Sequence, residues 1–174
     1  FYRILENDKE ITNILTGFCS GENISSFKSK QSNLNRLQTE ISVKADQTLT
    51  QLAKGFYEME LPFARTGVTS WNVASMPSSR ISPFAIPYFL IEDYDYTLQI
   101  PDTLELLTPV RNLEIRRDFG AVRIQLSKNG NMVKIRRTIE FVENEVNPMK
   151  YGELREIFIE WMDPQYRKLV FKKK

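Results

Sequence analysis

The feature that most constrains the fold is the tetrapeptide "KNGN" at residues 128–131, which separates two runs of alternating apolar and polar residues. Asn-Gly is the pair that two-residue hairpin turns prefer, because both residues tolerate the left-handed backbone conformation that such turns need. We therefore predict that Ala121–Ser127 pairs in antiparallel fashion with Met132–Phe141.

Alternation of apolar and polar residues predicts further short strands elsewhere in the chain. These runs are Leu37–Lys44, Phe56–Leu61, Tyr94–Ile100, Leu113–Arg116 and Leu169–Phe171. The stretch from Ser20 to Asn35 is rich in Ser, Asn, Gly and Lys, a composition that favours a loop. We expect residues 1–33 to form an irregular or linker segment, or to contribute to the same domain.

Near the C-terminus, the spacing of apolar residues changes from that of a strand to that of a helix. Apolar side chains recur at Tyr151, Leu154, Phe158 and Trp161. Asn147 suits an N-cap, Pro148 suits the first helical position, and Asp163-Pro164 predicts the helix end. Several short strands and one amphipathic helix predict a mainly β, α+β fold. We expect residues 34–174 to form an antiparallel β-sandwich-like domain with the C-terminal helix packed on it.

Composition excludes several classes of function. The 174 residues carry a net charge of only +2, so no strong field marks a nucleic acid as partner. No apolar run is long enough to span a membrane. With one cysteine, Cys19, and no histidine, the chain lacks an internal disulfide, the usual general base and the commonest metal ligand. We predict no catalytic residue, no metal site and no cofactor, and interpret Cys19 as a small apolar residue.

Three prolines punctuate the segment "MPSSRISPFAIPY", residues 76–88. Their spacings of six and four residues do not make a PxxP motif, and the apolar residues between them argue against a linker. We interpret the segment as a crossover between two sheets, in which each proline ends a pairing. Arg80 is expected to fix its path by bonding backbone carbonyls or a carboxylate, the acidic turn Glu92–Asp95 being the nearest candidate. An exposed Arg80 that grips a partner is the alternative.

Two further residues stand out. Trp71, in "GVTSWNV", is interpreted as a core residue, with an exposed site for a sugar or a protein as the alternative. Arg137 shares the inward parity of its apolar neighbours, which indicates either a β-bulge or a paired arginine at the rim. We regard Arg80, Trp71 and Arg137 as candidate structural or interface residues.

The sequence contains one basic and one acidic cluster, and we interpret both as solvent-exposed surface. Residues 111–137 carry a net charge of +6, and the nearly complete lack of aromatic residues there argues against nucleic-acid stacking. Arg116, Arg123, Lys134 and Arg136 have outward parity. The acidic group Glu92, Asp93 and Asp95 can in principle bind calcium or serve as paired acids, but we interpret it as a solvated structural cluster.

From about residue 34 onward, an ordered series of motifs resembles a known family. The series is "GFYEMELP", "SWNV", "SSRISPFAIPY", "YDYTLQIPDTLELLTP", "FGAVRIQLSKNGNMVKIRRTIEF" and "YGELREIFIEWMDPQYRKLVF". It looks like the C-terminal β domain, of unknown function, of secreted bacterial proteins with an upstream transglutaminase-like, papain-fold core.

The resemblance implies a non-catalytic domain, because the catalytic Cys, His and Asp of that family lie in the upstream core. It implies a periplasmic or extracellular location and a partner within the same chain, the transglutaminase-like domain, with a protein or glycan as substrate. Two functions remain open: an accessory domain of a transglutaminase or cysteine peptidase, and an independent glycan- or protein-binding module.

Overall fold

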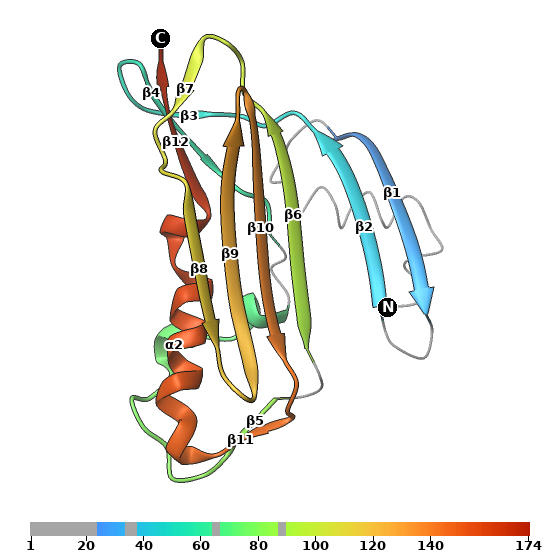
Figure 1. The fold of residues 1–174 in the computed structure, drawn as a ribbon, viewed down its shortest axis with the longest axis vertical. Coiled ribbons are helices and arrows are strands. Elements are labelled where there is room, and N and C mark those ends of the chain that lie inside the picture. Colours follow the sequence, from blue (N-terminus) through green and yellow to red (C-terminus); the bar gives the residue numbers. More distant parts are fainter. Residues whose placement is uncertain (1–23, 34–37, 64–66, 87–89) are drawn as a thin grey trace. The chain divides into compact units, whose positions relative to one another are not determined.

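The computed structural model describes residues 24–33, 38–63, 67–86 and 90–174. Its strands are β1 (Ile24–Asn33), β2 (Gln38–Ala45), β3 (Thr50–Ala53), β4 (Phe56–Glu60), β5 (Phe84–Ala85), β6 (Ile91–Gln99), β7 (Leu104–Leu106), β8 (Arg111–Arg116), β9 (Gly120–Asn129), β10 (Met132–Phe141), β11 (Glu145–Val146) and β12 (Lys168–Lys173), and its α-helix is α2 (Tyr151–Met162) (Figure 1). Short 3₁₀ helices span Gly67–Ser70, Val73–Ser75, Pro148–Lys150 and Pro164–Tyr166.

The chain divides into two compact units, which are described separately. One comprises Phe1–Thr50 with Pro62–Ala64, and the other comprises Gln51–Leu61 with Arg65–Lys174. In the first unit, β1 and β2 form an antiparallel pair. The prediction of a loop from Ser20 to Asn35 is therefore wrong over β1. The sequence of this strand, "ISSFKSKQSN", does not alternate, so only its pairing with β2 identifies it.

The second unit is built around a four-stranded antiparallel sheet in the order β6-β10-β9-β8, which we call the main sheet. The predicted hairpin is confirmed, since β9 and β10 pair without interruption from Asn129↔Met132 to Gly120↔Phe141. Gly130 adopts a φ of 58°, the left-handed conformation that the turn requires. In the strand order of the main sheet, the two strands of this hairpin occupy the central positions.

Helix α2 covers one face of the main sheet, which we call the inner face, and the two bury a continuous apolar core. The core combines residues of the helix, of β9, β10 and β11, of the segment between β4 and β6 and of the loop before β9: Val68, Val73, Ile86, Phe119, Val122, Ile124, Ile139, Phe141, Val146, Tyr151, Leu154, Ile157, Phe158 and Trp161. The predicted helical stripe is confirmed. Asn147 accepts a hydrogen bond from the Met149 N–H, but this cap opens the 3₁₀ turn that leads into α2.

A second four-stranded sheet has the order β3-β4-β12-β7. The predicted strands near Phe56–Leu61 and Leu169–Phe171 are confirmed as β4 and β12, which pair in antiparallel fashion. Strands β3 and β7, which the sequence pattern did not predict, flank them as edges. Both are only three or four residues long, too short for alternation to be detected.

The proline-rich segment lies between β4 of the second sheet and β6 of the main sheet, as its interpretation as a crossover requires. Directly after Pro83, β5 pairs with β11, and the following Ile86 is buried. Tyr88 lies outside the described residues. Ile81, in contrast, is fully exposed and contributes nothing to the core. The expectation of a β-rich α+β domain with a C-terminal helix packed on antiparallel sheets is confirmed.

Two isoleucines of α2 provide a matched test of this packing. Ile157 is completely buried, whereas Ile159 is 42% exposed on the same helix. Both substitutions to alanine delete the same side-chain atoms, but only the one at the buried Ile157 leaves a cavity. Ile157→Ala should therefore lower the free energy of unfolding by about 2–5 kcal/mol. Ile159→Ala should lower it by less than about 1 kcal/mol. Urea unfolding of both variants provides the measurement, and equal losses would show that α2 presents a different face to the sheet.

Candidate functional site

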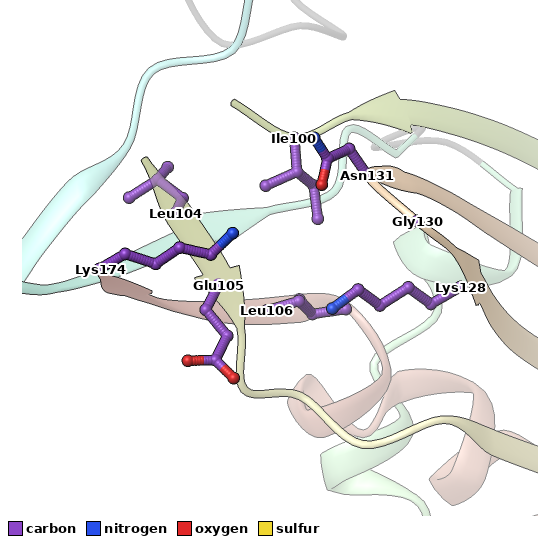
Figure 2. A pocket seen from close by; sticks show the side chains of 8 residues that line it. All are labelled: Ile100, Leu104, Glu105, Leu106, Lys128, Gly130, Asn131 and Lys174. Atoms are coloured by element: carbon purple, nitrogen blue, oxygen red, sulfur yellow. The ribbon is translucent and has the colours of Figure 1, made fainter. Parts of the chain in front are cut away.

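A small cavity lies where the turn between β9 and β10 meets β7 and the end of β12 (Figure 2). Its volume is about 190 Å³. It is lined by Ile100, Leu104, Glu105, Leu106, Lys128, Gly130, Asn131 and Lys174, and we call it the lysine pocket. Ile100 and Leu106 are buried, so the floor of the cavity is apolar, while both lysines are exposed.

Backbone hydrogen bonds hold the elements of the lysine pocket together. The Ile100 N–H donates to the Asn131 carbonyl at 2.8 Å, which joins the end of β6 to the hairpin turn. The Lys174 N–H donates to the Thr103 carbonyl at 2.9 Å, which joins the end of β12 to the loop before β7. The Asn131 amide also donates to Asp102. Three segments distant in sequence thus form one fixed frame.

Charged groups around the lysine pocket have a distinct arrangement. Figure 2 shows the Lys128 and Lys174 side chains reaching toward the cavity from opposite sides, whereas the Glu105 carboxylate points away from it. None of the ion pairs formed among the described residues involves Lys128 or Lys174. The cavity therefore combines an apolar floor with two unpaired ammonium groups.

Arg137 has a structural position that neither sequence-based alternative describes. The register of β10 with β6 and β9 is continuous through it, so there is no bulge, and the side chain is 1% exposed, so it is not at the rim. Its guanidinium donates to the Trp161 carbonyl at 2.5 Å and lies 4.4 Å from the centre of the Trp161 ring. Burial lowers the pKa of Arg137 to about 10, so the group stays protonated at neutral pH.

Glu92 is an acidic residue on the inner face of the main sheet, and its carboxylate interacts with the charge of Arg137. Its carboxylate accepts hydrogen bonds from the Val68 N–H at 2.6 Å and from the Tyr94 hydroxyl at 3.3 Å. Burial raises the pKa of Glu92, an effect that these bonds and the charge of Arg137 oppose. Gly67 adopts a φ of 66°, and a Cβ there would collide with this carboxylate. Glu92 thus ties the start of the 3₁₀ helix Gly67–Ser70 to β6.

Strand geometry separates the acidic group that the sequence places together. Because side chains alternate along β6, Glu92 faces inward while Asp93 and Asp95 face outward. Asp93 accepts two bonds from the Arg136 guanidinium, at 2.7 and 3.2 Å, and one from the Thr138 hydroxyl at 2.9 Å. Among the residues that the structure describes, no group of His, Cys, Asp and Glu is arranged to hold a metal ion.

The opposite, outer face of the main sheet carries the predicted basic residues, and its arginines have acidic partners. Arg123 pairs with both Glu114 and Glu140 at 3.0 Å, and Arg136 pairs with Asp93 at 2.7 Å. The outward parity predicted for Arg116, Arg123, Lys134 and Arg136 agrees with their exposed or half-buried positions. Two arginines of residues 111–137 are therefore paired with acids of β6, β8 and β10 on this face.

Arg80 differs from expectation. The side chain is half-buried, and the hydrogen bond that it forms in the described part of the chain is a long one, 3.4 Å, donated to the Ser82 hydroxyl. The guanidinium carbon instead lies 5.3 Å from the centre of the Phe84 ring and 5.7 Å from that of Tyr151. No hydrogen bond or ion pair joins Arg80 to the Glu92–Asp95 turn among the described residues, so the expected bond to that turn is wrong. Arg80 fixes the crossover through ring contacts.

Trp71 belongs to the border of the core. It is half-buried, with its ring centre 5.4 Å from that of Phe158 in an edge-to-face arrangement and 6.1 Å from that of Phe84. Both contacts are typical of aromatic core packing. The side chain thus joins the crossover to α2.

The lysine pocket was not predicted from the sequence. The sequence does contain lysines in the two segments that form it, namely Lys128 beside the "NG" turn and the run of lysines at residues 172–174. Those two segments meet only because β7 pairs with β12 and the Ile100 amide binds the hairpin turn. No local pattern encodes either contact.

Comparisons with known proteins give two matches. A family model described as a domain of unknown function with a solved structure, DUF3858, matches residues 54–171. A crystal structure described as that of a "putative protease" from Parabacteroides distasonis is similar with 30% identity and a TM-score of 0.61. The similarity covers 68% of this chain and only 23% of that one. No match was found among curated proteins.

Arg137 and its neighbour Arg136 provide a matched pair for testing the buried contact. Arg137→Ala should lower the free energy of unfolding by about 3 kcal/mol or more, because it leaves a cavity and an unpaired Trp161 carbonyl. Arg136→Ala should change it little, since exposed ion pairs contribute little. Chemical denaturation monitored by tryptophan fluorescence compares them. A loss for Arg136→Ala as large as that for Arg137→Ala would contradict the assignment.

Glu92 predicts a pH dependence of stability. Its pKa is raised in the folded state, so folding favours the protonated form, and its contribution to stability falls as pH rises from the unfolded pKa through the folded one. Glu92→Gln keeps an oxygen for the Val68 N–H and removes the titration. The stability difference between variant and wild type should therefore shift in favour of Glu92→Gln as the pH rises above about 4.3, the ordinary pKa of glutamate. Parallel pH profiles would contradict this.

Proposed function

Because the chain belongs to the DUF3858 family, whose function is unknown, we propose that it is a non-catalytic accessory domain of a larger protein. The larger protein is a cysteine peptidase or a transglutaminase-like enzyme, exported to the periplasm or the cell exterior. The domain packs on the catalytic core or positions its substrate.

The observation that carries this proposal is the unequal coverage of the similar crystal structure. The match includes about two thirds of this chain but less than one quarter of the other, which is described as a "putative protease". The shared fold is therefore a minor part of that protein. A small domain beside a much larger remainder is the arrangement expected of an accessory module.

The residue chemistry of the chain supports a non-catalytic role. A peptidase or transglutaminase of the papain type needs a thiolate paired with a histidine, and this chain has no histidine. Its single cysteine, Cys19, lies outside the described residues. Among the described helices, none is long and apolar enough to cross a membrane. The export of the parent protein rests on the family resemblance of the motifs alone.

An independent binding module is the second candidate, and the lysine pocket is the observation that favours it. A cavity with an apolar floor and a few polar groups is the usual form of a small binding site. The two roles are compatible in one respect, because an accessory domain that positions a substrate also has to bind it.

Activity assays test the non-catalytic role. The 174-residue chain should neither cleave casein nor incorporate an amine into it, and the Cys19→Ala variant should behave identically. Turnover by the chain that Cys19→Ala abolishes would overturn the proposal.

A deletion tests the accessory role in the longer natural protein. Removing residues 51–174 should lower kcat/KM for a protein substrate much more than for a short peptide substrate, because only the former extends beyond the catalytic centre. Unchanged kcat/KM for both substrates, with an unchanged melting temperature, would show that the domain assists neither binding nor folding of the enzyme.

A further inference from the structure

The lysine pocket places two cations without acidic partners among the described residues beside an apolar cavity. On the outer face of the main sheet, Arg123 and Arg136 are held by carboxylates within 3.0 Å. Lys150 and Lys168 are likewise paired, with Asp118 and Glu58. Lys128 and Lys174, by contrast, form no ion pair with any described residue. An unpaired positive rim attracts an acidic partner, because charge complementarity guides encounter and orientation.

The apolar floor of the cavity favours a ligand that carries an apolar group. Ile100 and Leu106 form it, with Leu104 at its edge. A volume of about 190 Å³ equals that of roughly six water molecules at about 30 Å³ each. The space accepts one aliphatic side chain and is smaller than the cavities of about 300–1,000 Å³ that enclose whole small-molecule ligands. Water on such a floor is favourably displaced by an apolar group.

We propose that the lysine pocket binds an acidic peptide segment, which inserts one aliphatic side chain between Lys128 and Lys174 and places flanking carboxylates against their ammonium groups. Figure 2 shows the two lysines on opposite sides of the space, as carboxylates on both sides of an inserted residue require. Glu105 does not oppose this, because its carboxylate points away from the cavity. The inference goes beyond the accessory role, since it needs no neighbouring catalytic domain.

Nucleic acid fits the same surface less well. No aromatic ring lines the cavity, so there is no platform on which a base can stack. A free phosphate ion satisfies the lysines but leaves Ile100 and Leu106 without an apolar contact. The combination of positive rim and apolar floor therefore favours a peptide that carries both kinds of group.

Binding of labelled peptides to the 174-residue chain tests the proposal. The probe is acetyl-Asp-Glu-Leu-Glu-Asp-amide, and the comparison peptide has serine in place of leucine. Fluorescence anisotropy should show about tenfold weaker binding of the serine peptide, because the aliphatic contact is lost. Binding of the leucine peptide should weaken as salt rises. Amide resonances of Gly130 and Asn131 should shift on its addition.

Charge-reversal variants locate the site. Lys128→Glu and Lys174→Glu should each raise the Kd of the leucine peptide about tenfold. Lys134→Glu is the matched control: it changes the net charge equally, but Lys134 is exposed on the outer face of the main sheet. It should leave the Kd within about twofold, because the Lys134 side chain lies on the opposite face of the β9–β10 hairpin from the Lys128 side chain.

Three outcomes would overturn the proposal. The first is no binding of the leucine peptide, and the second is equal binding of the leucine and serine peptides, which would indicate attraction by charge alone. The third is tighter binding of a single-stranded oligonucleotide that is lost in Lys128→Glu, which would assign the surface to nucleic acid. None of these results bears on the accessory role, which the deletion in the longer protein tests separately.

Discussion

The contact between Arg137 and Trp161 determines how the two layers of the larger unit are held together. A buried guanidinium is strongly unfavourable unless its charge is compensated. Here the compensation comes from the end of α2, where the last carbonyl groups of a helix lack intrahelical partners and carry partial negative charge. The Trp161 carbonyl accepts the bond, and the Trp161 ring lies against the cation. The Arg137 side chain of β10 thus gives a carbonyl at the C-terminal end of α2 its hydrogen-bond partner, and it fixes the position of that helix end on the main sheet.

Glu92 extends this polar connection to the crossover. It lies on the same inner face, two residues along the sheet from the register position of Arg137, and its carboxylate accepts the Val68 N–H. The left-handed Gly67 permits that approach, because a side chain there would collide with the carboxylate. Sheet, helix and crossover are therefore joined by directional bonds inside an otherwise apolar core. Such bonds specify one arrangement where apolar packing alone tolerates several.

Charge on the remaining surface falls into two classes. The outer face of the main sheet is rich in charge, but Arg123 and Arg136 are compensated by acids on neighbouring strands. Its exposed ion pairs contribute little to stability. The lysine pocket lies at one end of the unit with its two lysines unpaired. A charge left uncompensated beside an apolar cavity is available to a partner.

Local pattern determined much of this protein. Alternation predicted β2, β4, β6, β8 and β12, the Asn129-Gly130 pair predicted the central hairpin, and helical spacing predicted α2, because each depends on residues close together in the chain. Strand β1 was missed because its residues do not alternate. The partner of Arg137 was missed because parity gives the face of a residue but not what lies on it, and the Tyr151 ring beside Arg80 was missed because it is distant in the sequence. Only the tertiary structure decided that Arg137 meets the end of α2 and that Lys128 meets Lys174. These contacts depend on the pairing order of the strands and on the packing of the layers, which residues far apart in the sequence determine jointly.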